Sequence, residues 1–196
     1  MAATPRFRIE WTTDVGTLAA IEPKLTDVVA HAAELAAGYN EPQNARLMGH
    51  SEPLSEMEVV EHYTSLWAEG AHAFLLYVDS QLVGDADLRG IRGGVAEFAF
   101  MIGRPARQRR GLGTKFAVMV HACGFARLGL ERVYVSIVPK NQASRRVFEK
   151  LGYKVDEGTE ARAFADEAED LTMVIKHIDF ERLWTPMLAE IRTAGQ

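Results

Sequence analysis

A glycine pair flanked by arginines is the strongest candidate for a binding loop in this sequence. The loop reads Gln108-Arg109-Arg110-Gly111-Leu112-Gly113-Thr114. Gly111 and Gly113 remove side chains from the turn, so the backbone can approach a ligand closely. A helix that begins here has unpaired N–H groups that donate to phosphate oxygens, and the arginines add charge-assisted bonds. These residues predict a diphosphate site, and they match neither a Walker A loop nor G-x-G-x-x-G.

Cations gather around this loop in a chain that is acidic overall. The net charge is -5, yet the segment 103–115 contains no acid and five cations, namely Arg104, Arg107, Arg109, Arg110 and Lys115. An acidic chain argues against a general binder of nucleic acid or anionic membrane, whose affinity comes from neutralising phosphates. We therefore expect one local anion site, with no nucleic acid and no membrane among the partners.

Apolar periodicity places the loop between a strand over 95–102 and a helix that Gly129 closes. Before them, the pattern predicts a strand around 7–11, helices over 26–37 and 55–70, and an antiparallel hairpin over 73–78 and 81–88. After them, it predicts a strand over 132–138, a helix over 141–150, a strand over 171–178, and a helix over 180–191 that Pro186 should kink or interrupt. This order indicates a mixed α/β (α+β) fold and disfavours a Rossmann fold.

Composition predicts one domain over residues 1–196. The chain is 47% hydrophobic and 25% charged, and no linker-like stretch divides it. Without a signal-like or membrane-spanning apolar run, a cytoplasmic location is expected. Cys123 is the only cysteine, and the six histidines lack ligand-like spacing. We therefore expect no intrachain disulfide and no metal.

A second motif follows the loop at a compatible spacing. It begins with Asn141-Gln142-Ala143-Ser144 and ends with Gly152-Tyr153. The two motifs together resemble the GNAT acetyltransferase superfamily, whose cofactor motif reads Gln/Arg-x-x-Gly-x-Gly/Ala and whose later segment reads Asn-x-x-Ser/Ala and ends in Gly-Phe/Tyr. The resemblance covers about residues 73–178, and the segment 55–67 is similar to the second helix of the RimJ/RimL-like branch.

The resemblance implies a mostly antiparallel sheet, flanked by helices and splayed between the strands 95–102 and 132–138, with acetyl-CoA in the splay. Its diphosphate would meet backbone amides of the glycine loop, and its pantetheine arm would pair with the strand that precedes the loop. The implied cofactor-binding residues are Met101, Ile102, Gln108, Arg109, Arg110, Gly111, Leu112, Gly113, Thr114 and Asn141.

Catalytic roles are implied for two residues. In the family, a glutamate on the strand before the loop often acts as the general base, and Glu97 occupies that strand here. The alternative is that Glu97 simply faces solvent on an antiparallel strand. Phe148 stands where many members have a proton-donating tyrosine, so Ser144 is the candidate general acid. The alternative is that Ser144 is only a residue of the first helical turn whose hydroxyl bonds to the backbone. Tyr134 and Tyr153 are further candidates that core packing also explains. Cys123, on an apolar helix face, is predicted to be a buried and inert thiol.

An acidic segment near the C-terminus bears on the amine acceptor. Seven acids lie in the segment 156–170, which the family would place near the acceptor cleft: Asp156, Glu157, Glu160, Asp166, Glu167, Glu169 and Asp170. A cationic amine suits that field, and a solvated loop is the alternative. We predict an N-acetyltransferase for a primary amine, either a protein N-terminus or a small molecule. A noncatalytic acyl-CoA-binding module and a phosphate- or nucleic-acid-binding domain are the competing interpretations, and a homodimer stays open.

Overall fold

The computed structural model describes residues 6–48, 52–103 and 111–195. Within them, the strands form one open nine-stranded sheet in the order β7-β8-β6-β5-β4-β3-β2-β1-β9. The strands are β1 (Phe7–Thr13), β2 (Gly16–Ile21), β3 (His72–Val78), β4 (Gln81–Arg92), β5 (Val95–Ile102), β6 (Arg132–Ile137), β7 (Lys154–Val155), β8 (Leu171–Lys176) and β9 (Arg192–Gly195). Neighbouring strands are antiparallel except for β5 and β6, which are parallel. The predicted mixed, mostly antiparallel sheet is confirmed.

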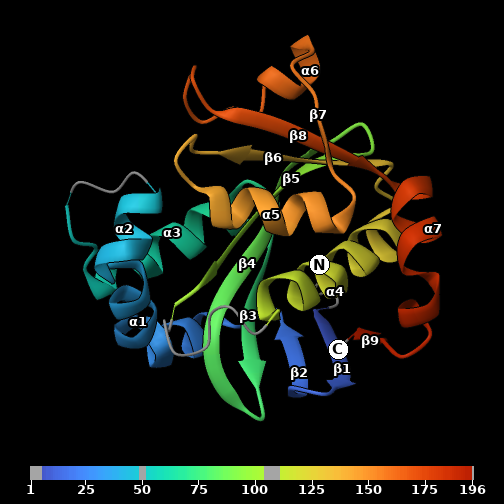
Figure 1. Cartoon of the computed structure of the whole chain (residues 1–196). Helices are drawn as coiled ribbons and strands as arrows, with labels where there is room; N and C mark the ends of the chain where they lie inside the picture. Colours follow the sequence, from blue (N-terminus) through green and yellow to red (C-terminus); the bar gives the residue numbers. More distant parts are fainter. Residues whose placement is uncertain (1–5, 49–51, 104–110, 196) are drawn as a thin grey trace.

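Helices cover both faces of the sheet (Figure 1). They are α1 (Leu25–Tyr39), α2 (Pro42–Met48), α3 (Glu56–Ala68), α4 (Leu112–Leu128), α5 (Gln142–Leu151), α6 (Thr159–Arg162) and α7 (His177–Leu188). α1 and α3 pack with Leu75 and Met101 on one face, whereas α4, α5 and α7 pack with Phe74 and Phe98 on the other. Because strand side chains alternate between faces, β3 and β5 contribute to both cores.

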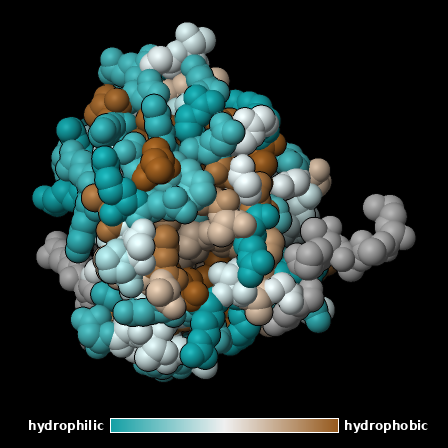
Figure 2. Space-filling view, turned by 90° about the vertical axis from the view of Figure 1, so that its right-hand side faces the viewer, coloured by the Kyte–Doolittle hydropathy of each residue, from teal (hydrophilic) through white to brown (hydrophobic). Residues whose placement is uncertain are grey.

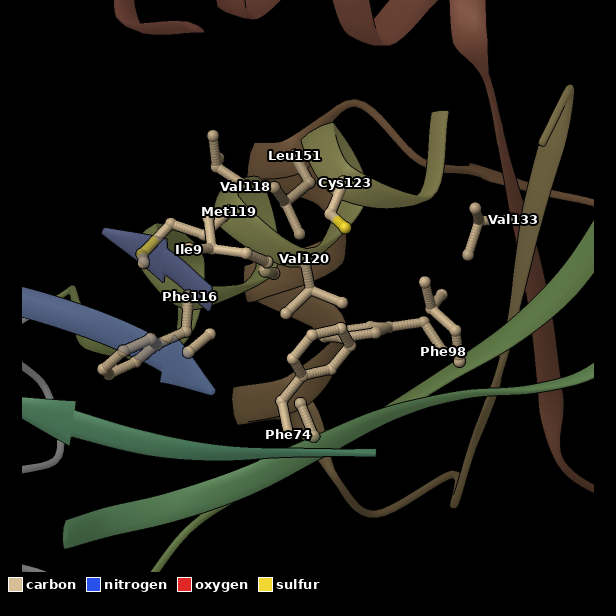
Figure 3. Close-up of a cluster of buried hydrophobic side chains, with 14 of the residues drawn as sticks. Ile9, Phe74, Phe98, Phe116, Val118, Met119, Val120, Cys123, Val133 and Leu151 are labelled. Atoms are coloured by element: carbon tan, nitrogen blue, oxygen red, sulfur yellow. The ribbon is translucent and has the colours of Figure 1, made fainter. Parts of the chain in front are cut away.

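The larger core is centred on α4. Val120 points from this helix toward Phe74 of β3 and Phe98 of β5 (Figure 3). Phe116 and Cys123 are also fully buried, and burial raises the pKa of the Cys123 thiol to about 12. The prediction of a buried, inert thiol is therefore confirmed. A helix with apolar residues on nearly all sides needs cover all around, and the sheet, α5 and α7 supply it.

Five elements were absent from the sequence prediction: β2, α2, β7, α6 and β9. β2 and β9 flank β1 and extend the sheet at its N-terminal side. The predicted break at Pro186 also differs from the structure, because α7 runs through Pro186 and ends two residues later, at Leu188. A proline in the last turn removes few backbone hydrogen bonds, so the helix tolerates it there.

α7 packs on the chain's own core. Phe180 is buried and the Trp184 indole donates a hydrogen bond to the Leu151 carbonyl, 3.1 Å away. On the side of the molecule seen in Figure 2, hydrophilic surface surrounds separate apolar spots. The exposed apolar side chains of α7 are Ile178 and Leu183.

A buried histidine lies between α4 and the C-terminal half of the chain. Nδ1 of His121 donates to the Ala117 carbonyl, because a carbonyl can only accept, and Nε2 then accepts from the Tyr153 hydroxyl. Burial lowers the pKa of His121 to about 4. His121 is therefore neutral at physiological pH, and Tyr153 is occupied in the core.

Acid is expected to weaken the fold through His121. An unperturbed histidine titrates near pKa 6.5, so between about pH 6.5 and about pH 4 the unfolded chain binds a proton here that the folded chain does not. The free energy of unfolding therefore falls as the pH drops through this window, by about 2 kcal/mol at pH 5 from this group. Urea unfolding at about pH 7 and about pH 5 measures the change. The double variant His121→Phe/Tyr153→Phe removes both hydrogen-bonding partners and should lose this share of the pH dependence; an unchanged dependence would exclude His121 as its source.

Candidate functional site

The sheet opens between β5 and β6. The two strands pair at Val95–Arg132, Ala96–Val133 and Glu97–Tyr134, and the pairing ends there. From that point the strands diverge (Figure 1). The predicted splay is confirmed, and the far half of β5 presents a strand edge whose backbone groups can pair with an extended ligand.

A cavity of about 610 Å³ lies where this splay meets the start of α4. We call it the loop cavity. Its lining includes eight of the residues that the sequence singled out: Met101, Ile102, Gly111, Leu112, Gly113, Thr114, Asn141 and Ser144. Gln108, Arg109 and Arg110 lie outside the described residues. The structure thus brings the described part of the predicted loop, the end of β5 and the start of α5 around one space.

Glycine is required at the start of α4 for two different reasons. Gly111 caps the helix in a left-handed conformation, with φ of 75°. At Gly113, a Cβ atom would lie 2.9 Å from the Phe100 ring, so only glycine lets α4 begin this close to β5. The first-turn amides of a 17-residue helix therefore border the loop cavity, where they favour an anion.

Four cations that sequence reasoning missed also line the loop cavity: Arg46, Lys140, Arg146 and Lys150. No carboxylate is among the described lining residues. Arg146 and Lys150 are one helical turn apart on α5, a signal that was available from the sequence. Arg46 belongs to α2, which was not predicted. This charge distribution suits a ligand with several negative charges.

Two asparagines fix the walls of the loop cavity. Asn44 of α2 donates from Nδ2 to the Gly38 carbonyl at 2.8 Å and to the Gly103 carbonyl at 3.3 Å. Asn141 caps α5 by accepting from the Ser144 amide at 3.0 Å, and it donates to the Leu47 carbonyl at 3.5 Å. α2 is therefore tied to the end of β5 on one side and to the start of α5 on the other.

A second cavity, of about 290 Å³, opens on the other side of β5. The two cavities share the lining residues Met48, Phe100 and Met101. The second cavity has four carboxylates in its lining, from Glu58, Asp85, Asp87 and Asp166. We call it the acidic cavity. A cationic space and an acidic space thus meet at the end of β5.

The acidic cavity is built on the face of β4 that points toward α1 and α3. Asp85 is buried there, and its Oδ2 accepts hydrogen bonds from the Tyr39 hydroxyl at 2.5 Å and the Tyr63 hydroxyl at 2.9 Å. Burial raises the pKa of Asp85 to about 6, and the two tyrosine hydrogen bonds act in the opposite direction. Burial also raises the pKa of both tyrosines, which stay protonated donors.

Asp87, two residues along the same face, has an unsatisfied oxygen. Its Oδ1 is buried and accepts no hydrogen bond within the described part of the chain. The nearest cation is Arg89, whose Nε lies 3.6 Å from that oxygen. The pKa of Asp87 is raised to about 7, mainly by burial; the charge of Arg89 lowers it, and the charges of Asp85, Glu97 and Asp166 raise it. A carboxylate with a pKa near neutrality is suited to accept a proton from a reacting amine.

Glu97 faces neither solvent nor the acidic cavity. It is 8% exposed, and its two oxygens accept from Nε and Nη2 of Arg89 at 3.1 and 3.2 Å. The solvent-facing alternative is therefore wrong, because Arg89, directly opposite in the β4–β5 register, covers the carboxylate. The general-base role of Glu97 stays a prediction, as does the general-acid role of Ser144 in the loop cavity.

The acidic segment 156–170 contributes one carboxylate, Asp166, to the lining of the acidic cavity. Glu160 instead pairs with Arg132 and accepts from the Tyr134 hydroxyl. Asp170 is buried and accepts from the Ser136 hydroxyl. Sequence reasoning placed the acceptor field in this segment and overlooked Asp85 and Asp87. Two carboxylates at alternate positions of an otherwise apolar strand were the available signal, because such residues are rarely buried without a purpose.

No group of three or more histidine, cysteine, aspartate or glutamate side chains in the described residues is arranged to hold a metal ion. Likewise, the helices seen in those residues are all too short or too polar to cross a membrane.

Residues 24–154 match the sequence model of the acetyltransferase (GNAT) domain. Alpha/beta-tubulin-N-acetyltransferase 9 from Mus musculus is 29% identical over 90 residues, which is 46% of this chain. The chain aligns with about a third (35%) of that relative's length.

Similar folds occur among solved structures. Mycobacterium smegmatis RimJ in complex with CoA-disulfide has a TM-score of 0.70 at 16% identity, over 96% of this chain and 97% of that one. The aminoglycoside acetyltransferase AAC(6')-Ib in complex with coenzyme A has a TM-score of 0.68 at 17% identity, over 90% and 98% of the two chains. At these identities, the likeness concerns the fold.

Proposed function

This chain belongs to the acetyltransferase (GNAT) domain family, and we propose that it transfers an acetyl group from acetyl-CoA directly to a primary amine. The observation that carries the proposal is the meeting of the two cavities. A cationic space suited to a phosphate-bearing ligand and an acidic space suited to an amine share Met48, Phe100 and Met101. Such an arrangement brings an anionic donor and a cationic acceptor together at one point.

The loop cavity is the proposed binding site of acetyl-CoA, which supplies a thioester carbonyl for attack by the amine. First-turn amides of α4, with Lys140, Arg146 and Lys150, would hold the phosphates. The backbone of Met101 and Ile102 would pair with the extended pantetheine arm at the open edge of β5. Asn141 bounds the cavity from α5.

Asp87 is the proposed proton acceptor. As the new C–N bond forms and the C–S bond breaks, the proton leaves the amine nitrogen for the carboxylate of Asp87, whose raised pKa matches this task. Ser144 is the hydroxyl that we assign to passing a proton to the departing thiolate while it takes one up from solvent, so that it remains a hydroxyl. In this proposal Asp87 takes the general-base role that the family resemblance implied for Glu97, and Glu97 has a positioning role, since its two hydrogen bonds hold Arg89 beside Asp87.

The relatives support two kinds of amine acceptor, a protein and a small molecule. The name of the mouse relative specifies tubulin, whereas AAC(6')-Ib has been solved in complex with kanamycin. The acidity of the cavity supports a cationic acceptor of either kind.

Calorimetric titration with acetyl-CoA, CoA and ATP tests the donor site. We expect micromolar binding of both CoA forms and weaker binding of ATP, because the open edge of β5 can pair with the pantetheine arm, which ATP lacks. Release of free thiol from acetyl-CoA is then measured with a panel of primary amines. Acetyl transfer to one of them is the expected result.

The same experiment separates the proposal from its alternative. CoA binding without turnover on any amine would indicate a noncatalytic acyl-CoA-binding module. If neither CoA form binds, the assignment of the loop cavity to acetyl-CoA is refuted.

A further inference from the structure

The acidic cavity holds one more buried carboxylate than proton transfer requires. Asp87 is sufficient to accept the proton, yet Asp85 is buried in the same lining and is held by two tyrosines. Burying a second carboxylate is costly, and the two tyrosine hydrogen bonds offset only part of that cost, because the pKa of Asp85 stays raised to about 6. An inference about the role of Asp85 rests on the function proposed above, because Asp85 lies on the acceptor side of the same site.

Asp85 and Asp87 are arranged along a line. They occupy alternate positions of β4, so their side chains leave the same face about 6 to 7 Å apart. The register places Asp87 opposite Ala99, nearer to the point where β5 and β6 part, and Asp85 opposite Met101, nearer to the loop. With the phosphates held at the start of α4, the reactive end of the donor extends toward that parting point. Asp87 is therefore the carboxylate beside the reaction, and Asp85 is displaced from it along the strand.

The cation in the described lining of the acidic cavity, Arg89, is already paired with carboxylates. Arg89 gives two hydrogen bonds to Glu97 and lies 3.6 Å from the unsatisfied Oδ1 of Asp87. Besides Asp85 and Asp87, the lining includes the carboxylates of Glu58 and Asp166. His62 and Tyr39 are the other titratable groups in this lining, and Tyr39 carries no charge because burial raises its pKa. Glu58 and Asp166 are exposed to solvent, and Glu58 already accepts hydrogen bonds from Ser55, so the buried carboxylates of the lining are Asp85 and Asp87. A monocationic amine bound at Asp87 would leave Asp85 without a cation.

The remaining walls are apolar. Met48, Leu54, Val59, Phe100 and Met101 contribute them, in a space of about 290 Å³. Such walls suit methylene groups and offer few partners for the hydroxyls of a sugar. The volume of this cavity is too small to enclose a bulky acceptor completely.

We infer that the acceptor is a small alkyl diamine, whose reacting nitrogen lies at Asp87 and whose second, protonated nitrogen lies at Asp85 of the cavity floor. Tyr39 and Tyr63 fix the Asp85 carboxylate for this contact. Asp85 is thus a specificity residue, which recognises charge at a set distance from the reaction. The methylene chain packs against the apolar walls.

Steady-state acetylation of matched amines tests this inference. Putrescine and cadaverine are compared with n-butylamine and n-pentylamine, which have the same carbon chains and one amine fewer, and with a peptide that has a free N-terminus. We expect kcat/KM to be about 10- to 100-fold higher for the diamines, the range of one hydrogen-bonded charge contact. Asp85→Asn should bring this preference close to unity, mainly by raising KM for the diamine.

Two variants control for folding and for bulk charge. Glu61→Gln removes an exposed carboxylate of α3 outside the cavity and should keep the diamine preference. Tyr63→Phe keeps the Asp85 charge, loses one of its two hydrogen bonds, and should raise the diamine KM by a smaller factor. If Asp85→Asn fails to fold by thermal unfolding, Tyr63→Phe carries the test.

The possible failures are distinguishable. If monoamines or the peptide are acetylated as well as the diamines, or if Asp85→Asn keeps the preference, the inference is overturned while acetyl transfer stands. If acetyl-CoA binds and no amine of any class is acetylated, the proposed function itself fails.

Discussion

Replacement of Asp87 by asparagine is expected to lower kcat for acetyl transfer by about 10²- to 10⁴-fold, the usual contribution of a general base. Asparagine keeps the size of the side chain and cannot take up the proton. Asp87 lines the acidic cavity and not the loop cavity, so acetyl-CoA affinity should change little. Steady-state kinetics and calorimetric titration of the same variant measure the two quantities.

The pH dependence of the rate gives a second measure of the same role. Burial raises the pKa of Asp87 to about 7, so the carboxylate gains a proton and stops acting as a base as the pH falls below this value. The wild-type kcat should therefore decline toward acid with a midpoint near pH 7, and Asp87→Asn should lose this step.

Glu97→Gln is the matched control for Asp87→Asn. It removes a buried carboxylate of the same network, and its loss acts on the reaction only through Arg89. We expect a smaller decrease in kcat for Glu97→Gln than for Asp87→Asn. If kcat falls further in Glu97→Gln than in Asp87→Asn, Glu97 is the general base instead.

Replacement of Gly111 by aspartate is expected to weaken CoA binding by about 30- to 100-fold relative to replacement by asparagine. Both side chains have the same size and tolerate the left-handed conformation of this residue, so the pair isolates the charge. A carboxylate about 6 Å from a phosphate charge costs about 2 to 3 kcal/mol at an effective dielectric constant near 20. Calorimetric titration of both variants with CoA gives the ratio of dissociation constants.

Salt provides the internal control for the Gly111 pair. Raising the ionic strength should narrow the difference between the aspartate and asparagine variants, because screening weakens a repulsion near the surface. Equal CoA affinity of the two variants at low salt would show that the phosphates do not lie at the start of α4.

The two cavities depend on opposite charges that lie close together. Cations from α2, α5 and the turn before α5 surround one space, and carboxylates from β4, α3 and Asp166 surround the other. The chain as a whole carries a net charge of -5, which reveals neither arrangement. Local charge, placed by the fold, is what separates a donor side from an acceptor side.

The sequence by itself determined the parts of the site that depend on neighbours along the chain. Gly111 and Gly113 define the start of α4, and Asn141 caps α5, because a helix terminus is built by the few residues around it. The strand and helix periods likewise predicted the central sheet and the order of its elements. All described residues of the predicted cofactor set line one cavity because they flank the splay between β5 and β6.

Only the tertiary structure decided the acceptor side. Asp85 becomes part of a cavity because Tyr39 and Tyr63, 46 and 22 residues away in sequence, bring their hydroxyls to it from α1 and α3. Glu97 became a buried partner of Arg89 through the register of a hairpin that residue types alone did not specify. Burial and the charges of distant residues set the pKa of Asp87, so its suitability as a base exists only in the folded chain.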